Sequence, residues 1–139
     1  MGDMSRVFSI GRLPEQAYTA HQTCIEIQEE IAAMAKPGTV CEDMYNKAIE
    51  IVTKAGFADY FMGVDQKAKF IGHGIGLEIN EMPVLAPRMK QELEPGMVFA
   101  LEPKIVLPGI GPVGIENSWA VTTDGLEKLT LCKEEIIEL

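Results

Sequence analysis

The chain has 139 residues, and its 21 acidic against 12 basic side chains give a formal net charge of −9. This acidic excess argues against nucleic acid or an anionic membrane surface as the main partner, and no apolar run approaches the ~20 residues of a membrane span. An apolar fraction of 47% fits a single folded domain over residues 1–139. With no export signal and no CxxC pair, we expect a cytoplasmic protein with reduced, buried thiols at Cys24, Cys41 and Cys132.

The N-terminal part predicts a short strand followed by a long helix. Residues 5–10 alternate between polar and apolar side chains, as in a strand. Pro14 suits the first turn of a helix, where its missing N–H costs nothing, and Pro37-Gly38 ends that helix. We expect His21 on this helix to be solvated. The helix carries an apolar stripe at spacings of three and four: Ala17, Ala20, Cys24, Ile27, Ile31 and Met34.

A second helix and a strand-rich half are predicted to follow. Thr39 and Glu42 have the spacing of a capping box, and Gly56 is expected to close the helix. Residues 57–69 show no clear pattern, and residues 123–125 (TDG) predict a turn. The β-prone runs are 97–101, 104–107, 115–122 and 134–139. This order of elements predicts the α+β class.

Four residues stand out as candidates for chemistry. His73 lies among glycines that let the backbone approach an ion or a substrate closely. Glu102 and Glu116 follow apolar runs, and buried carboxylates need a partner such as a cation. Together with Asp3 these side chains are suitable ligands for Mn²⁺, Co²⁺, Fe²⁺ or Zn²⁺. Each residue also has a plain structural interpretation. His73 can be a structural histidine, and Glu102 can be a salt-bridged strand end. Glu116 can face the surface, and Asp3 can belong to a frayed terminus. Spacing alone does not assemble them into one site.

The amino-acid sequences of several segments, and their order along the chain, resemble those of the creatinase/aminopeptidase family, which includes methionine aminopeptidase, aminopeptidase P and prolidase. The resemblance covers nearly the whole chain and is strongest for the aminopeptidase P/prolidase branch. It implies a pita-bread fold, with helices packed on a curved antiparallel sheet, of which this chain would be the C-terminal part. The segments that carry it are DMSRVFSIG, KPGTVCEDMYNKA followed by AGF, GHGIGLEINEMP, LEPGMVFALEP and GIENSWAVTTDG.

The resemblance also implies roles for individual residues. Asp3 and Glu116 would bridge two divalent metals, and His73 and Glu102 would ligate one of them. The implied reaction is hydrolysis of an N-terminal peptide bond by metal-activated water, with the metals polarising the carbonyl. The implied substrates are peptides with proline at the second position.

The chain departs from the family pattern at four places. A metal-binding aspartate expected upstream of Asp3 is absent, so we expect at most one well-coordinated metal. Asn80 stands where family peptidases have a histidine that contacts the substrate, and asparagine cannot shuttle a proton near neutral pH. Residues 69–71 lack a second family histidine, and Gly114 replaces an arginine. The N-terminal strands of the full fold would also be missing, and pairing in a homodimer could cover the open sheet edge.

These observations leave three functions open. The parent protein can be a metal-dependent Xaa-Pro aminopeptidase or dipeptidase, impaired or inactive as this chain. It can be a non-catalytic pita-bread binding module, as Asn80 and Gly114 suggest. It can also be a creatinase-like C–N hydrolase that acts without metal, with His73 as the base.

Overall fold

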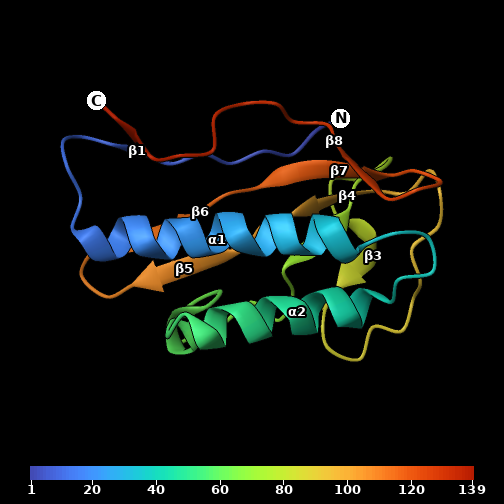
Figure 1. The fold of residues 1–139 in the computed structure, drawn as a ribbon, viewed down its shortest axis with the longest axis horizontal. Helices are drawn as coiled ribbons and strands as arrows, with labels where there is room; N and C mark the ends of the chain where they lie inside the picture. Colours follow the sequence, from blue (N-terminus) through green and yellow to red (C-terminus); the bar gives the residue numbers. More distant parts are fainter.

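The computed structural model describes residues 1–139 as two antiparallel helices, α1 (Glu15–Met34) and α2 (Cys41–Lys54), that lie side by side over the strands (Figure 1). The largest sheet has five strands in the order β3-β2-β4-β7-β8, and all of its neighbouring pairs are antiparallel. The pair β5-β6 is antiparallel, and β1-β9 is parallel. The bounds of the strands are β1 Phe8–Ser9, β2 Gly72–Gly74, β3 Glu81–Leu85, β4 Val98–Leu101, β5 Lys104–Leu107, β6 Gly111–Gly114, β7 Asn117–Val121, β8 Leu126–Lys128 and β9 Ile137–Glu138.

The hydrophobic core lies between the helices and the strands. The predicted apolar stripe of α1 is buried from Ala17 to Ile31, and it packs with fully buried side chains of the strands such as Phe99 and Ile105. The α+β class and the strands at 97–101 and 104–107 are confirmed within one residue at each end. Strands β2, β3, β6 and β8 were not predicted, because they are short and rich in glycine, proline or charge.

The prediction of a capping box at α2 is wrong. The N-cap residue is Val40, and no side chain caps the helix. The Thr39 hydroxyl instead accepts a hydrogen bond from the Lys36 backbone N–H. The C-terminal end follows the prediction: Gly56 has φ +84°, and the backbone N–H groups of Gly56 and Phe57 close the last turn on Thr53 and Val52.

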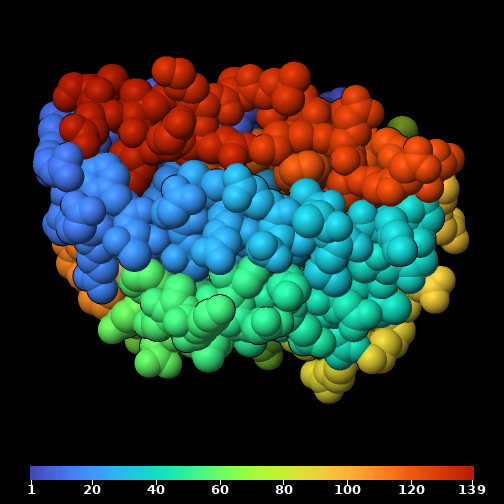
Figure 2. All heavy atoms as spheres, in the orientation of Figure 1, coloured from blue at the N-terminus to red at the C-terminus, as the bar shows by residue number.

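The C-terminal segment runs over the upper side of α1, next to the N-terminal segment (Figures 1 and 2). Phe8 in β1 pairs with Ile137 in β9. This cover corrects two expectations: His21 is buried, with its Nε2 2.6 Å from the backbone oxygen of Glu134, and Cys132 is exposed. Neither helix combines the length and the apolar character that a membrane crossing would need.

Candidate metal centre

The structure brings three of the four predicted metal ligands together. Asp3 comes from the N-terminal segment, His73 from the middle of β2, and Glu116 from the residue before β7. His73 Nε2 lies 3.8 Å from Asp3 Oδ2 and 4.0 Å from Glu116 Oε1. One ligand atom from each residue lies within 4.8 Å of the other two. Segments more than 100 positions apart in the chain therefore converge on one small volume.

The imidazole of His73 is oriented by its own strand. His73 Nδ1 lies 3.1 Å from the carbonyl oxygen of Gly74. A carbonyl oxygen only accepts hydrogen bonds, so Nδ1 carries the proton of the neutral ring and donates it. The lone pair then resides on Nε2, the nitrogen that faces Asp3 and Glu116. This tautomer suits a metal-ligating histidine whose second nitrogen donates to a carbonyl.

The glycines that flank His73 serve the sheet. A Cβ on Gly72 would lie 2.4 Å from the carbonyl oxygen of Ala100 in β4, and one on Gly74 would lie 2.2 Å from that of Met82 in β3. Neither contact is tolerable for a side chain. The glycines therefore allow three backbones to approach closely, whereas the sequence suggested that they make room for a ligand.

Glu116 is buried and hydrogen-bonded. The Ser5 hydroxyl donates to Glu116 Oε2 at 2.6 Å, and the backbones of the two residues form an antiparallel bridge. Burial raises the pKa of the Glu116 carboxyl above its ordinary value; the Ser5 hydrogen bond opposes this rise, and the neighbouring carboxylates of Glu102 and Asp3 add to it. The pocket thus favours either a proton or a cation at this carboxylate.

The backbone of Asp3 is held from both sides by one serine. The Ser118 hydroxyl accepts a hydrogen bond from the Asp3 N–H at 2.9 Å and donates one to the Asp3 carbonyl at 2.8 Å. Arg6 fastens the same segment, because its guanidinium donates to the Glu116 carbonyl at 2.9 Å and to Asn117 Oδ1 at 2.7 Å. The N-terminal segment is therefore built into the site.

Glu102 lies next to Glu116 and forms a salt bridge with Lys104. Its Oε2 lies 2.9 Å from the ammonium of Lys104. Lys104 is paired with Gly114 across β5 and β6. A Cβ at Gly114 would lie 3.0 Å from both Cα and Cγ of Lys104, so the lysine stem passes over the bare glycine.

A hollow of about 320 Å³ adjoins the imidazole. Its wall includes His73, Asn80 and Glu81 and is completed by the apolar side chains of Phe70, Met82 and Val84. The structure therefore places the predicted residue Asn80 in the wall of the same hollow as the candidate ligand His73.

The chemistry of the donor set suits one divalent cation. Two ligands at ~2.1 Å from a shared ion can lie up to ~4.2 Å apart; the two separations from His73 Nε2, 3.8 and 4.0 Å, lie below that limit, and the three ligand atoms lie within 4.8 Å of one another. The imidazole presents a lone pair, the carboxylates supply the negative charge, and oxygen with nitrogen donors suits Mn²⁺, Fe²⁺, Co²⁺ or Zn²⁺.

The sequence did not point to the supporting residues Ser5, Ser118 and Lys104. Ser5 and Lys104 each lie two positions from a candidate ligand, and Ser118 lies two positions from Glu116. This spacing returns a side chain to the same face of an extended strand. It is a weak signal, but it was present at all three positions.

Residues 1–123 match the model of metallopeptidase family M24. The Xaa-Pro dipeptidase of Pyrococcus furiosus is 32% identical over 135 residues, which is 97% of this chain and 37% of that protein. The Xaa-Pro dipeptidase of Lactobacillus helveticus is 34% identical over 128 residues, or 92% of this chain and 33% of that protein. The chain thus spans about a third of the length of these relatives.

Solved structures agree with these matches. The X-Pro aminopeptidase of Thermotoga maritima superposes with a TM-score of 0.89 at 31% identity, covering 99% of this chain and 37% of that one. The Xaa-Pro dipeptidase of Bacillus anthracis superposes with a TM-score of 0.87 at 34% identity, covering 98% of this chain and 37% of that one. The expected pita-bread fold is confirmed, and the chain belongs to metallopeptidase family M24.

Proposed function

We propose that this chain is the metal-binding part of a hydrolase that cleaves N-terminal peptide bonds, with Xaa-Pro peptides as substrates. The observation that carries the proposal is the convergence of Asp3, His73 and Glu116, with Nε2 of His73 3.8 and 4.0 Å from the two carboxylates. The similarity to Xaa-Pro dipeptidases and to an X-Pro aminopeptidase supports the substrate class.

In this proposal Asp3, His73, Glu102 and Glu116 hold the metal, with Mn²⁺, Co²⁺, Fe²⁺ and Zn²⁺ as candidates. We expect one well-held ion here and up to two in the complete fold. The ion would polarise the substrate carbonyl and activate water. Glu102 would exchange its contact with Lys104 for the ion, since its carboxylate already borders Glu116.

The chain's own residues would bind and orient the peptide. The apolar wall of the hollow, formed by Phe70, Met82 and Val84, would receive a substrate side chain and exclude water. The Asn80 amide can donate a hydrogen bond to a substrate carbonyl but cannot transfer a proton near neutral pH. We therefore propose slow turnover, and Asn80→His should raise kcat.

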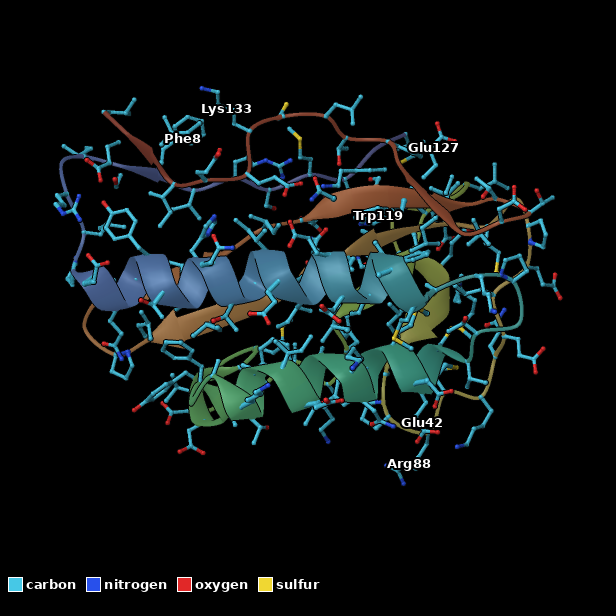
Figure 3. The ribbon with its side chains drawn as sticks, viewed as in Figure 1. Phe8, Glu42, Arg88, Trp119, Glu127 and Lys133 are labelled. Atoms are coloured by element: carbon cyan, nitrogen blue, oxygen red, sulfur yellow. The ribbon has the colours of Figure 1, made fainter.

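Calorimetric titration with Mn²⁺ tests the metal site. The unaltered chain should bind about one ion, while His73→Ala and Glu116→Gln should lose it. Glu127→Gln is the matched control, because Glu127 is an exposed carboxylate on β8, outside the candidate ligand set (labelled in Figure 3). Binding that is absent in the unaltered chain, or equal in all four proteins, contradicts the proposal.

Hydrolysis of Ala-Pro by the Mn²⁺-loaded chain, compared with Ala-Ala, tests the substrate class. Faster release of alanine from Ala-Pro supports an Xaa-Pro peptidase. If the chain binds metal and cleaves neither dipeptide, even as Asn80→His, the second candidate takes its place: a pita-bread binding module, favoured by Asn80. If it cleaves a small C–N compound without metal, it is creatinase-like.

Location and assembly belong to the same proposal. The free thiols of Cys24, Cys41 and Cys132 support a reducing, cytoplasmic environment. We also propose that residues 1–139 act as one part of a larger pita-bread domain, and that a homodimer is its assembly. Analytical ultracentrifugation of the purified protein checks the dimer, which a monomer at micromolar concentration would contradict.

A further inference from the structure

One polar side chain lies in the middle of the buried face of α1. Gln28 is 1% exposed and stands between Cys24 and Ile31 on the apolar stripe. A buried amide needs hydrogen-bond partners, because an unpaired one costs roughly 1–3 kcal/mol. Gln28 has a partner for each of its polar groups, and these partners lie on β4, on β7 or at Ile115 just before β7, close in the chain to Glu102 and Glu116.

The amide nitrogen of Gln28 bridges two strand ends. It donates to the carbonyl oxygen of Leu101 at 2.7 Å and to that of Ile115 at 3.2 Å. Leu101 directly precedes Glu102, and Ile115 directly precedes Glu116. One side chain on α1 therefore binds the backbone carbonyls of the two residues that directly precede Glu102 and Glu116.

The amide oxygen of Gln28 fixes which way the group points. It accepts hydrogen bonds from Asn117 Nδ2 at 3.0 Å and from the Trp119 indole N–H at 3.2 Å. An indole N–H only donates and a backbone carbonyl only accepts, so the amide cannot be reversed without losing bonds on both sides. Figure 3 shows Trp119 between α1 and the strands.

The partner Asn117 is anchored in turn. Its Oδ1 accepts from Arg6 at 2.7 Å and from Thr130 at 2.8 Å, while its Nδ2 also donates to Glu134 Oε1 at 3.1 Å. The network is fully bonded, and a buried network of this kind favours a single arrangement of the segments that it joins.

We propose that Gln28 is a positioning residue for the metal centre. It sets the spacing between the strand ends that precede Glu102 and Glu116, and thereby the separation of the two carboxylates. The inference rests on the proposed metal site. It goes beyond that site in assigning metal affinity to a helix residue that touches neither ligand side chain.

The test compares Mn²⁺ affinity by calorimetry in the unaltered protein, Gln28→Met and Ile31→Val. Methionine keeps the length of glutamine and removes both the donor and the acceptor. Ile31→Val is the matched control, because Ile31 is fully buried on the same helix and contributes only apolar packing. We expect Gln28→Met to weaken Mn²⁺ binding by about 10–100-fold, as for other residues that support metal ligands, and Ile31→Val to leave it within about twofold.

The outcomes separate the two ideas. No Mn²⁺ binding by the unaltered protein overturns the proposed metal site itself. Normal binding by the unaltered protein, with equal affinities in Gln28→Met and Ile31→Val, overturns only the role of Gln28.

A second variant and a spectroscopic measurement cover the case in which Gln28→Met does not fold. Gln28→Glu keeps the size and the acceptor for Trp119 but cannot donate as a carboxylate, so it should weaken binding similarly. Trp119 is the only tryptophan, and its indole N–H is bonded to Gln28. Zn²⁺ binding to the unaltered protein should therefore shift its emission, and unchanged emission at saturating Zn²⁺ contradicts the coupling.

Discussion

Replacing Gly72 with alanine should separate two strands that position the site. The new Cβ would lie 2.4 Å from the carbonyl oxygen of Ala100 and 3.3 Å from Leu85 Cδ2. Restoring the backbone contact to the 3.4 Å at which ordinary contacts begin requires a separation of about 1 Å between β2 and β4 (3.4 − 2.4). Forcing a packed interior apart in this way costs about 1–3 kcal/mol. For a domain of this size that corresponds to a fall in Tm of about 3–12 °C.

Thermal unfolding followed by circular dichroism measures this effect. Gly2→Ala is the control, since a Cβ there meets no atom within 4 Å. We also expect weaker Mn²⁺ binding by Gly72→Ala, because β2 carries His73 and β4 leads into Glu102. If Gly72→Ala and Gly2→Ala melt within about 1 °C of each other, the close approach of the strands does not constrain position 72, and the reasoning is refuted.

Three further predictions follow from single contacts. Burial lowers the pKa of His21 below 6.5, its Nδ1 has no partner, and its Nε2–H is used by Glu134. The unfolded state therefore binds more protons, and the free energy of unfolding should fall as the pH drops below 6.5. The charged neighbours of His21 are Arg6, Glu134 and Glu135. Thermal melts at a series of pH values should show a smaller fall for His21→Leu than for the unaltered protein. Ser5→Ala removes the hydroxyl bonded to Glu116 and should weaken Mn²⁺ binding by about 10-fold in calorimetry, with unchanged affinity as the contrary result. Gly56→Ala places a side chain at φ +84° and should cost about 1 kcal/mol in urea unfolding, and a neutral result would show that the C-terminus of α2 adjusts freely.

The helices were predictable because their signal is local. The apolar stripe from Ala17 to Ile31 repeats at helical spacing, and Gly56 supplies a conformation that other residues adopt at a cost. The capping box failed for a long-range reason. The Glu42 carboxylate accepts from the Arg88 N–H at 3.0 Å and pairs with Lys90, across more than 40 positions, and the two segments meet at the lower edge of the molecule (Figure 3). Spacing within a segment carries no information about such partners.

The sequence indicated which residues could be metal ligands, but it did not indicate that they lie close together in the folded chain. Asp3, His73 and Glu116 lie on three separate segments that no periodicity links. Only the resemblance to a known family placed them in one site, and the folded chain then brought their ligand atoms within 4.8 Å. His21 shows the reverse case. It looked solvated beside an apolar stripe, and the C-terminal segment buries it.

The pairing of β5 with β6 alters the interpretation of Gly114, which stands where the family has an arginine. In the sequence, the lack of the family's arginine at this position favoured a non-catalytic module. In the folded chain, Lys104 is the direct cross-strand partner of Gly114, and its ammonium lies 2.9 Å from Glu102 Oε2. A side chain at position 114 would collide with the stem of Lys104 and with the Pro103 carbonyl oxygen at 2.4 Å. Glycine is thus what allows the lysine to reach the carboxylate. The site keeps a positive charge beside its acidic groups, supplied by Lys104, so Gly114 no longer argues against catalysis. The argument from missing residues then rests on Asn80, on residues 69–71 and on the aspartate expected upstream of Asp3.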